Sequence, residues 1–327
     1  MTHIPFARRR LLLGASLALA VPTVFANEPG YPSRAIRLVI PFAPGGPSDH
    51  TGRIIGDALA ARLGQPIVVE NRPGGGGILA AGQVARATPD GYTIMLGVTG
   101  SHGIAGALRK DLGYDALRDF EPIGKAVIYA NAIVVSPDTP AKDLPSLIQL
   151  IKSGDPRYKT YGTDGAGTAS HLTFELLKQR GGFESEAVQY KGAAPLLTDV
   201  AGGFVKVGIT GLPTAETFIA AGRVHLIAVT TERDLTGKGY KSIAEQGFPG
   251  FQAAPFSGFF APKGTPKPIV DKLANELEIV MRDPKVLAQL SKLGLQATPL
   301  KSEEFRRDLA QEISNWTEAV KAAKITQ

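Results

Sequence analysis

Serine and histidine stand side by side twice in the sequence, as Ser101-His102 and Ser170-His171. With an acid such as Asp49, they supply the residue types of a serine hydrolase, which needs a nucleophile, a base and an orienting acid. However, the sequence contains no G-x-S-x-G elbow, and adjacent residues at a helix start do not face each other. The pairs therefore favour another role, in which hydroxyls and backbone N–H groups are offered where two helices begin.

Metal and nucleotide chemistry lack their sequence signatures. The chain has no cysteine and no H-E-x-x-H pattern, so His102 and His171 are interpreted as local hydrogen-bonding groups rather than metal ligands. The segment after the first predicted strand reads A-P-G-G-P-S-D instead of G-x-G-x-x-G, and no G-x-x-x-x-G-K-[ST] occurs. These absences argue against a dinucleotide site and exclude a P-loop. We therefore expect no cofactor and no metal.

A loop rich in glycine and proline is the strongest candidate for a binding element. The apolar, β-branched stretch Ile36–Phe42 predicts a buried strand, and Asp49–Leu63 predicts an amphipathic helix that ends at Gly64. Ser48 or Asp49 is predicted to be the N-cap of this helix. A helix N-terminus that follows a strand of an open α/β sheet favours an anion through its free N–H groups and its dipole. The alternative is a tight turn that binds nothing.

The alternation of strand and helix continues along the chain, which predicts an α/β fold whose mostly parallel sheets are flanked by helices. The apolar run Phe120–Ser136 is long for one strand, so it predicts either two strands in tandem or a strand that crosses from one sheet to another. Phe256–Ala261 is interpreted as the return crossing. Phe305 and Leu309 are expected to pack the last helix back on the first domain. The other predicted strands are Ile67–Glu70, Tyr92–Leu96, Lys159–Gly162, Ala187–Tyr190, Val205–Thr210 and Leu226–Thr230, and the other predicted helices are Ile78–Ala87, Leu144–Lys152, His171–Gln179, Leu196–Ala201, Glu216–Ala221, Lys267–Arg282, Pro284–Leu293 and Ser302–Ala323.

Loops at four predicted helix starts suit a small anion held in a crevice between two such domains. Their backbone N–H groups lie at Gly45–Asp49, Gly100–Ser101, Gly167–Ser170 and Gly192–Ala194. A carboxylate held in this way gains charge-assisted hydrogen bonds without an arginine. Hydroxyls are available from Ser48, Ser101, Thr168 and Ser170. The hydroxyl of Thr168 is expected to contact the ligand, with capping of its own helix as the alternative.

The N-terminus has the features of an export signal. Arg8 to Arg10 precede the apolar stretch from Leu11 to Phe25, and Val24-Phe25-Ala26 resembles a cleavage site. Removal of residues 1–26 deletes three arginines and no acid, which lowers the formal net charge from +6 to +3. No basic block with interleaved aromatic residues indicates nucleic-acid binding. We expect a soluble periplasmic protein, exported by a general or a twin-arginine route; an uncleaved membrane anchor is the alternative.

Five blocks of the sequence point to one family. They read YPSRAIRLVIPFAPGG from residue 31, GQPIVVENRPGGGG from 64, PDGYTIMLG from 89, YKGAAP from 190 and FFAPKGTP from 259. In this order they resemble the solute-binding proteins of tripartite tricarboxylate transporters, the Bug-type proteins common in β-proteobacteria. The resemblance is collinear from residue 31 to near the C-terminus.

The resemblance implies a two-lobed periplasmic binding protein of the type II, Venus-flytrap kind, with two crossing strands as its hinge. Lobe 1 is expected to comprise residues 27–128 and 257–327, and lobe 2 residues 129–256. Such a protein captures a small organic acid and delivers it to large and small membrane permease subunits, and we expect a monomer. The alternatives are that the loaded protein signals to a sensor kinase or another regulatory partner, or that it is an enzyme on the same fold.

The resemblance also implies a binding site without catalytic residues. Two positions depart from the common family pattern and suggest a different ligand: Pro47-Ser48-Asp49-His50 follows the glycine pair, and Thr210-Gly211 precedes Leu212-Pro213. Asp49 is interpreted first as a capping residue, because an acid would repel a bound carboxylate, and Lys191 is expected to contribute mainly its loop backbone. The expected contacts are Phe42, Ala43, Gly45, Gly46, Ser48, Asp49, Thr99, Ser101, His102, Gly167, Thr168, Ala169, Ser170, His171, Tyr190, Lys191, Gly192, Ala193 and Thr210.

Overall fold

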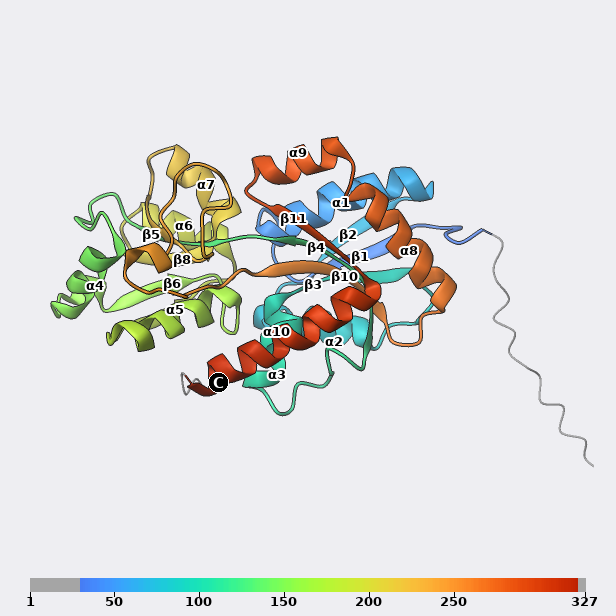
Figure 1. Cartoon of the computed structure of the whole chain (residues 1–327), viewed down its shortest axis with the longest axis horizontal. Helices are drawn as coiled ribbons and strands as arrows, with labels where there is room; N and C mark the ends of the chain where they lie inside the picture. Colours follow the sequence, from blue (N-terminus) through green and yellow to red (C-terminus); the bar gives the residue numbers. More distant parts are fainter. Residues whose placement is uncertain (1–29, 323–327) are drawn as a thin grey trace, which may run out of the picture. The chain divides into compact units, whose positions relative to one another are not determined.

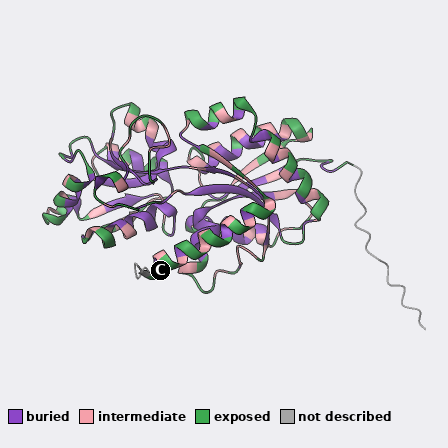
Figure 2. Ribbon diagram, in the orientation of Figure 1, coloured by how far each residue is buried: buried purple, intermediate pink, exposed green. Residues whose placement is uncertain are grey.

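The computed structural model describes residues 30–322, and the predicted signal peptide, residues 1–26, lies outside them. The described residues form two β-sheets flanked by helices, as the sequence predicts (Figure 1). The strands are mainly buried, whereas most of the exposed residues lie on the helices and loops (Figure 2). Within residues 30–322, no helix combines the length and apolar character needed to cross a membrane.

The first sheet contains the strands β1 (Ile36–Ile40), β2 (Ile67–Asn71), β3 (Thr93–Val98), β4 (Phe120–Ile128), β10 (Phe256–Pro262) and β11 (Gln296–Lys301). Their order is β11-β4-β10-β3-β1-β2. β1 pairs in parallel with β2 and β3, and β10 pairs antiparallel with β3 and β4. Interior parallel strands are covered on both faces, which explains why all residues of β1 except Arg37 are apolar and buried. β11 was not predicted, because its sequence QATPLK is polar, contains a proline and lies partly exposed at the sheet edge.

The second sheet contains the strands β5 (Asn131–Val135), β6 (Thr160–Thr163), β7 (Glu186–Gln189), β8 (Val207–Gly211) and β9 (His225–Val229). Their order is β7-β6-β8-β5-β9. β6 pairs in parallel with β7 and β8, whereas β5 is antiparallel to β8 and β9. Every residue of β5 and of β8 is buried, so these strands form the centre of the second core.

The apolar run Phe120–Ser136 contains features of both predicted alternatives, because it forms two strands in tandem and these belong to different sheets. β4 belongs to the first sheet and β5 to the second, and only two residues separate them. The chain returns between β9 and β10 (Figure 1). The two connections touch, because the backbone N–H of Tyr129 donates to the carbonyl of Pro255 at 3.0 Å. The exact division into lobes at residues 128/129 and 256/257 remains a prediction.

The helices are α1 (Pro47–Leu63), α2 (Ile78–Ala85), α3 (Ala105–Leu108), α4 (Leu144–Lys152), α5 (Ala169–Gly181), α6 (Ala193–Ala201), α7 (Leu212–Ala220), α8 (Lys267–Val280), α9 (Pro284–Lys292) and α10 (Ser302–Ala322). Each predicted helix is present among the described residues, although α1, α5, α6 and α7 begin earlier than predicted. The predicted N-cap of α1 is wrong: Gly46 occupies that position, and Pro47 starts the helix because its ring sets a helical φ. Gly64 ends α1 in a left-handed conformation, with φ 69°, as predicted.

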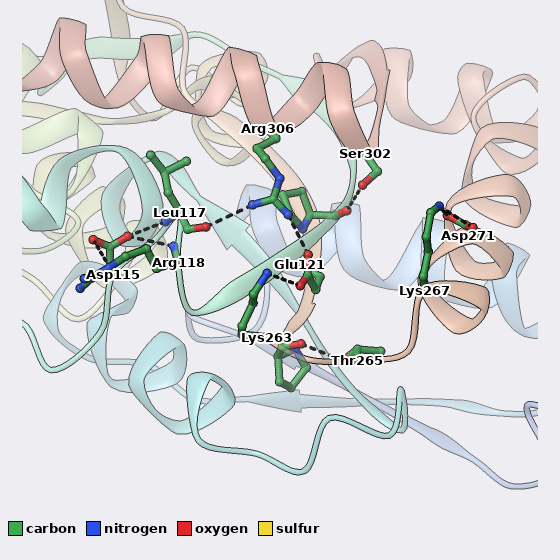
Figure 3. Close-up of polar contacts among 12 residues, drawn as sticks. Asp115, Leu117, Arg118, Glu121, Lys263, Thr265, Lys267, Asp271, Ser302 and Arg306 are labelled. Atoms are coloured by element: carbon green, nitrogen blue, oxygen red, sulfur yellow. Dashed lines mark hydrogen bonds and ion pairs between the residues drawn. The ribbon is translucent and has the colours of Figure 1, made fainter. Parts of the chain in front are cut away.

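The last helix closes the first core. Phe305 and Leu309 of α10 are completely buried in a cluster with Val39 and Phe260, which confirms their predicted role. Polar contacts also join α10 to β4. Arg306 pairs with Glu121 at 2.7 Å, and the hydroxyl of Ser302 donates to the carbonyl of Pro122 at 2.6 Å. Figure 3 shows Lys263 reaching the same Glu121 carboxylate from the other side. α10 is therefore held on the first sheet by apolar and polar contacts together.

Candidate functional site

A pocket lies where helix N-termini that follow strands of the two sheets come together. It encloses about 690 Å³, part of which is open to solvent. The loops that precede α1, α5 and α6 line it, together with the end of β3 and the crossing residues Tyr129, Asn131 and Pro255. The pocket therefore combines loops of the first sheet with loops of the second.

The three helix starts supply hydrogen-bond donors to this pocket. N–H groups in the first turn of an α-helix have no acceptor within their own helix. Ser48 in α1, Ala169 and Ser170 in α5, and Ala193 and Ala194 in α6 occupy such positions and line the pocket. The dipoles of these helices direct their positive ends toward the same space. The arrangement is suited to an anion.

The pocket brings together most, but not all, of the predicted contacts. The predicted residues that line it are Phe42, Ala43, Gly46, Ser48, Thr99, Thr168, Ala169, Ser170, Lys191, Gly192 and Ala193. The predicted residues that do not line it are Gly45, Asp49, Ser101, His102, Gly167, His171, Tyr190 and Thr210. Each residue of the second group contacts other residues of the chain instead, as described below.

Asp49 holds the loop before α1 rather than facing the pocket. Its carboxylate accepts hydrogen bonds from the backbone N–H of Gly45, from Arg53 and from Asn71, each at 3.0 Å. Burial opposes ionisation, but the hydrogen bonds from Arg53, Asn71 and Gly45 outweigh it and hold the pKa of Asp49 below its usual value. Asn71 also donates to the carbonyl of Phe42 at 2.9 Å. The N–H of Gly45 is therefore occupied by Asp49.

Ser101 and His102 belong to the core of the first lobe instead of the pocket. Both are almost completely buried. The Ser101 hydroxyl lies 2.8 Å from Nδ1 of His102 and 3.3 Å from the carbonyl of Val98. The imidazole stacks on Phe260 with ring centroids 4.1 Å apart, and burial lowers the pKa of His102 to about 3. Their neighbour Thr99 does line the pocket, and its hydroxyl accepts the backbone N–H of Phe256 at 2.8 Å.

The loop before α5 is fixed by its own hydroxyl and imidazole groups. Thr168 is the N-cap: its hydroxyl donates to the carbonyl of Gly165 at 2.7 Å and accepts the N–H of His171 at 3.3 Å. Nδ1 of His171 in turn accepts the N–H of Gly167 at 3.3 Å. Burial lowers the pKa of His171 more than nearby Glu175 raises it. Thr168 therefore lines the pocket while its hydroxyl caps α5, and its contact with a ligand stays a prediction.

Two further predicted contacts, Tyr190 and Thr210, donate their hydroxyls to carboxyl groups of the chain itself. The Tyr190 hydroxyl donates to the Asp199 carboxylate at 2.7 Å, and burial together with Asp199 raises the pKa of Tyr190 to about 12. The Thr210 hydroxyl donates to the carboxyl of Asp164 at 2.9 Å. Asp164 itself lines the pocket, so Thr210 reaches the site through it.

Sequence reasoning missed Tyr129, Asn131 and Asp164. Tyr129 and Asn131 are polar residues within the apolar crossing run, a break in pattern that marks them in hindsight, and Asp164 directly follows β6. Asn131 is 2% exposed, and its Nδ2 has no hydrogen-bond partner within the described chain. Buried polar groups normally have partners, so this amide is available to a ligand. The other lining residues that were not predicted are Pro44, Pro47, Val98, Gly100, Ala194, Pro195 and Pro255.

Metal ligation has no support in the side-chain positions. Within residues 30–322, no three histidine or carboxylate side chains lie together in a way that could hold a metal ion. The donors in the pocket are N–H, amide and hydroxyl groups, which suit an anion, and one carboxyl, that of Asp164, lies among them.

Comparisons with known proteins agree on one family. A family model described as the tripartite tricarboxylate transporter family receptor matches residues 51–325. The R. palustris protein Rpa4515, solved with adipate, is 33% identical, with a TM-score of 0.87 over 90% of this chain and 99% of that protein. The periplasmic binding protein BugD is 34% identical, with a TM-score of 0.85 over 90% and 99%. MatC from Rhodopseudomonas palustris, solved with bound malate, is 31% identical, with a TM-score of 0.83 over 89% and 100%.

Proposed function

Since this chain belongs to the tripartite tricarboxylate transporter receptor family, as a Bug-type solute-binding protein, we propose that it captures a small carboxylate in the pocket between its two lobes. It then delivers the acid to the large and small permease subunits of a tripartite transporter. In this proposal the protein acts as a periplasmic monomer after removal of residues 1–26. Lobe 1 comprises residues 27–128 and 257–327, and lobe 2 residues 129–256.

The observation that carries the proposal is the convergence of donors on one pocket. The starts of α1, α5 and α6 present first-turn N–H groups, and the Asn131 amide adds an unpartnered side-chain donor. Charge-assisted hydrogen bonds from such donors hold a carboxylate without a metal or an arginine. The related proteins solved with adipate and with malate support the same ligand class, because both of those ligands are dicarboxylates.

The position of the donors supports capture between the lobes. Ser48 and Thr99 come from the first sheet's loops, whereas Thr168 and Ala193 come from the second sheet's loops. A ligand that contacts both sets stabilises the arrangement in which they are close, by its difference in affinity for that arrangement. A permease can then distinguish loaded from empty protein by the arrangement of the lobes.

Thermal-shift screening of mature protein tests the proposal. A ligand that binds only the folded state raises the melting temperature, so we expect a shift with at least one acid among mono-, di- and tricarboxylates, amino acids and aromatic acids. Calorimetry of metal-stripped protein should then show binding of the free acid and loss of binding for its full methyl ester. Equal affinity for acid and ester would contradict an anion pocket. Uptake into vesicles that hold the permease subunits should depend on added protein.

A further inference from the structure

Asp164 is the one carboxyl among the pocket-lining residues of the described chain. It follows β6 and is partly buried. One carboxyl oxygen accepts the hydroxyl of Ser170, and the other accepts the hydroxyl of Thr210 at 2.9 Å. The Ser170 hydroxyl also lies 2.8 Å from that of Thr168 and 3.1 Å from that of Thr163. A set of hydroxyls therefore fixes the position of this acid in the pocket wall.

No cationic side chain compensates Asp164 within residues 30–322. Asp49, which does not line the pocket, has Arg53 as its partner. The partners of Asp164 are all neutral: the hydroxyls of Ser170, Thr210 and Thr168 and its own backbone N–H. Lys191 also lines the pocket, but it is exposed and forms no ion pair with Asp164 among the described residues. Burial raises the pKa of the Asp164 carboxyl against the effect of its hydroxyl partners. Charges that lose contact with water are usually paired with an opposite charge, and the described chain supplies none for this partly buried carboxyl.

The uncompensated charge of Asp164 and the other polar groups of the pocket indicate the chemistry of the ligand. The hydrogen-bond partners of this carboxyl carry no charge, so none of them balances the negative charge of the ionised form. The other polar groups of the pocket, including the Asn131 amide and the helix-start N–H groups, are donors that suit a carboxylate. The pocket therefore presents donors together with one acidic acceptor. A ligand that complements both carries a negative and a positive group.

We infer that the ligand is a carboxylate that also carries an ammonium group, and that Asp164 receives the ammonium. This inference rests on the proposed function and narrows it from carboxylates in general to amino acids and amino-substituted acids. Asp164 is thus a specificity-determining residue, and Ser170 and Thr210 are positioning residues that orient its oxygens. A ligand hydroxyl would supply a donor but no charge, and is the competing possibility that the experiment distinguishes.

Matched ligand series test the inference on the unmodified mature protein. Calorimetry at pH 7 compares succinate, malate and aspartate; glutarate, 2-hydroxyglutarate and glutamate; and adipate with 2-aminoadipate. We expect the amino member of at least one series to bind ten-fold or more tighter than its unsubstituted and hydroxy members, because a charge-assisted hydrogen bond is about twice as strong as a neutral one. If an unsubstituted or hydroxy acid binds and no amino member exceeds it, the ammonium inference is overturned while the carboxylate function stands. If no carboxylate binds, the proposed function itself fails.

A pair of variants locates the effect. Asp164→Asn keeps the shape and removes the charge, and it should weaken binding of the preferred amino acid at least ten-fold and reduce its advantage over the unsubstituted acid. Glu312→Gln is the matched control: Glu312 on α10 is another partly buried acid with a raised pKa, and it accepts a hydrogen bond from Trp316 outside the pocket. It should leave the affinity unchanged. An undiminished preference in folded Asp164→Asn would overturn the role of Asp164, and if this variant fails to fold, the ligand series on unmodified protein still decides.

Discussion

The side-chain amide of Asn131 has no partner within the described chain. Its removal should therefore retain or raise the stability of the unliganded protein but weaken ligand binding. Its Nδ2 is buried in the pocket wall without an acceptor, and an unsatisfied buried donor costs about 1–3 kcal/mol. Asn131→Leu removes that donor while keeping a side chain of similar length at the start of β5. We therefore expect the unliganded variant to be at least as stable as the wild type, and more stable by about 1 kcal/mol if the leucine packs well.

Affinity should change in the other direction. A hydrogen bond to a charged group contributes about 1.5–3 kcal/mol, so loss of the amide donor to the ligand carboxylate should weaken binding roughly 10- to 100-fold. Urea unfolding of the unliganded protein measures the first quantity, and calorimetric titration with the acid found by thermal-shift screening measures the second. The combination of a retained fold and a weaker complex is the signature of a ligand-binding group.

Thr173→Val provides the matched control. The hydroxyl of Thr173 on α5 is also buried without a partner, but this residue does not line the pocket. Its replacement should raise or retain stability, by the same argument, and leave the dissociation constant unchanged. An unchanged dissociation constant in Asn131→Leu, or a loss of stability of several kcal/mol in that variant, would refute our assignment of a free donor facing the ligand.

Three further predictions concern groups that hold the site in place. Thr168→Val should lower the free energy of unfolding, measured by denaturant melting, by about 1 kcal/mol with little change in affinity, because the hydroxyl bonds to Gly165 and to the start of α5. A tenfold weaker complex with unchanged stability would instead show that this hydroxyl binds the ligand. Asp49→Asn should destabilise the protein near neutral pH, and the difference from wild type should disappear as the pH falls below about 4, because the folded-state pKa of Asp49 is lowered and its stabilisation is lost on protonation; a pH-independent difference in urea melts would contradict this. Burial lowers the pKa of His102 in the folded protein to about 3, so between about pH 6.5 and that value only the unfolded chain binds a proton at this residue. Wild-type stability should therefore fall toward acid by up to about 1.4 kcal/mol per pH unit. His102→Phe should reduce that slope between pH 6 and 4, and an identical slope would show that His102 is protonated in the fold.

The order of elements and the crossing between sheets could be predicted from the sequence because they follow from local patterns. Apolar runs bounded by glycine and proline predicted strands such as β1, and the length of Phe120–Ser136 indicated a second sheet. The edge strand β11 was not predictable in this way, since a partly exposed strand does not need an apolar pattern. Its position depends on pairing with β4, which is distant in sequence.

For the candidate site too, the sequence determined some features and the tertiary structure decided others. The sequence alone determined that glycine-rich loops at helix starts would supply N–H donors, because that property depends only on which residues begin a helix. Which side chains face the pocket was decided by the tertiary structure. Thr99 lines the pocket, whereas Ser101 and His102, two and three residues later, pack in the core. Asn131 and Asp164 became visible only when the crossing strand and the β6 loop were brought together, because a buried polar group reveals its purpose through the partners it has or lacks in space.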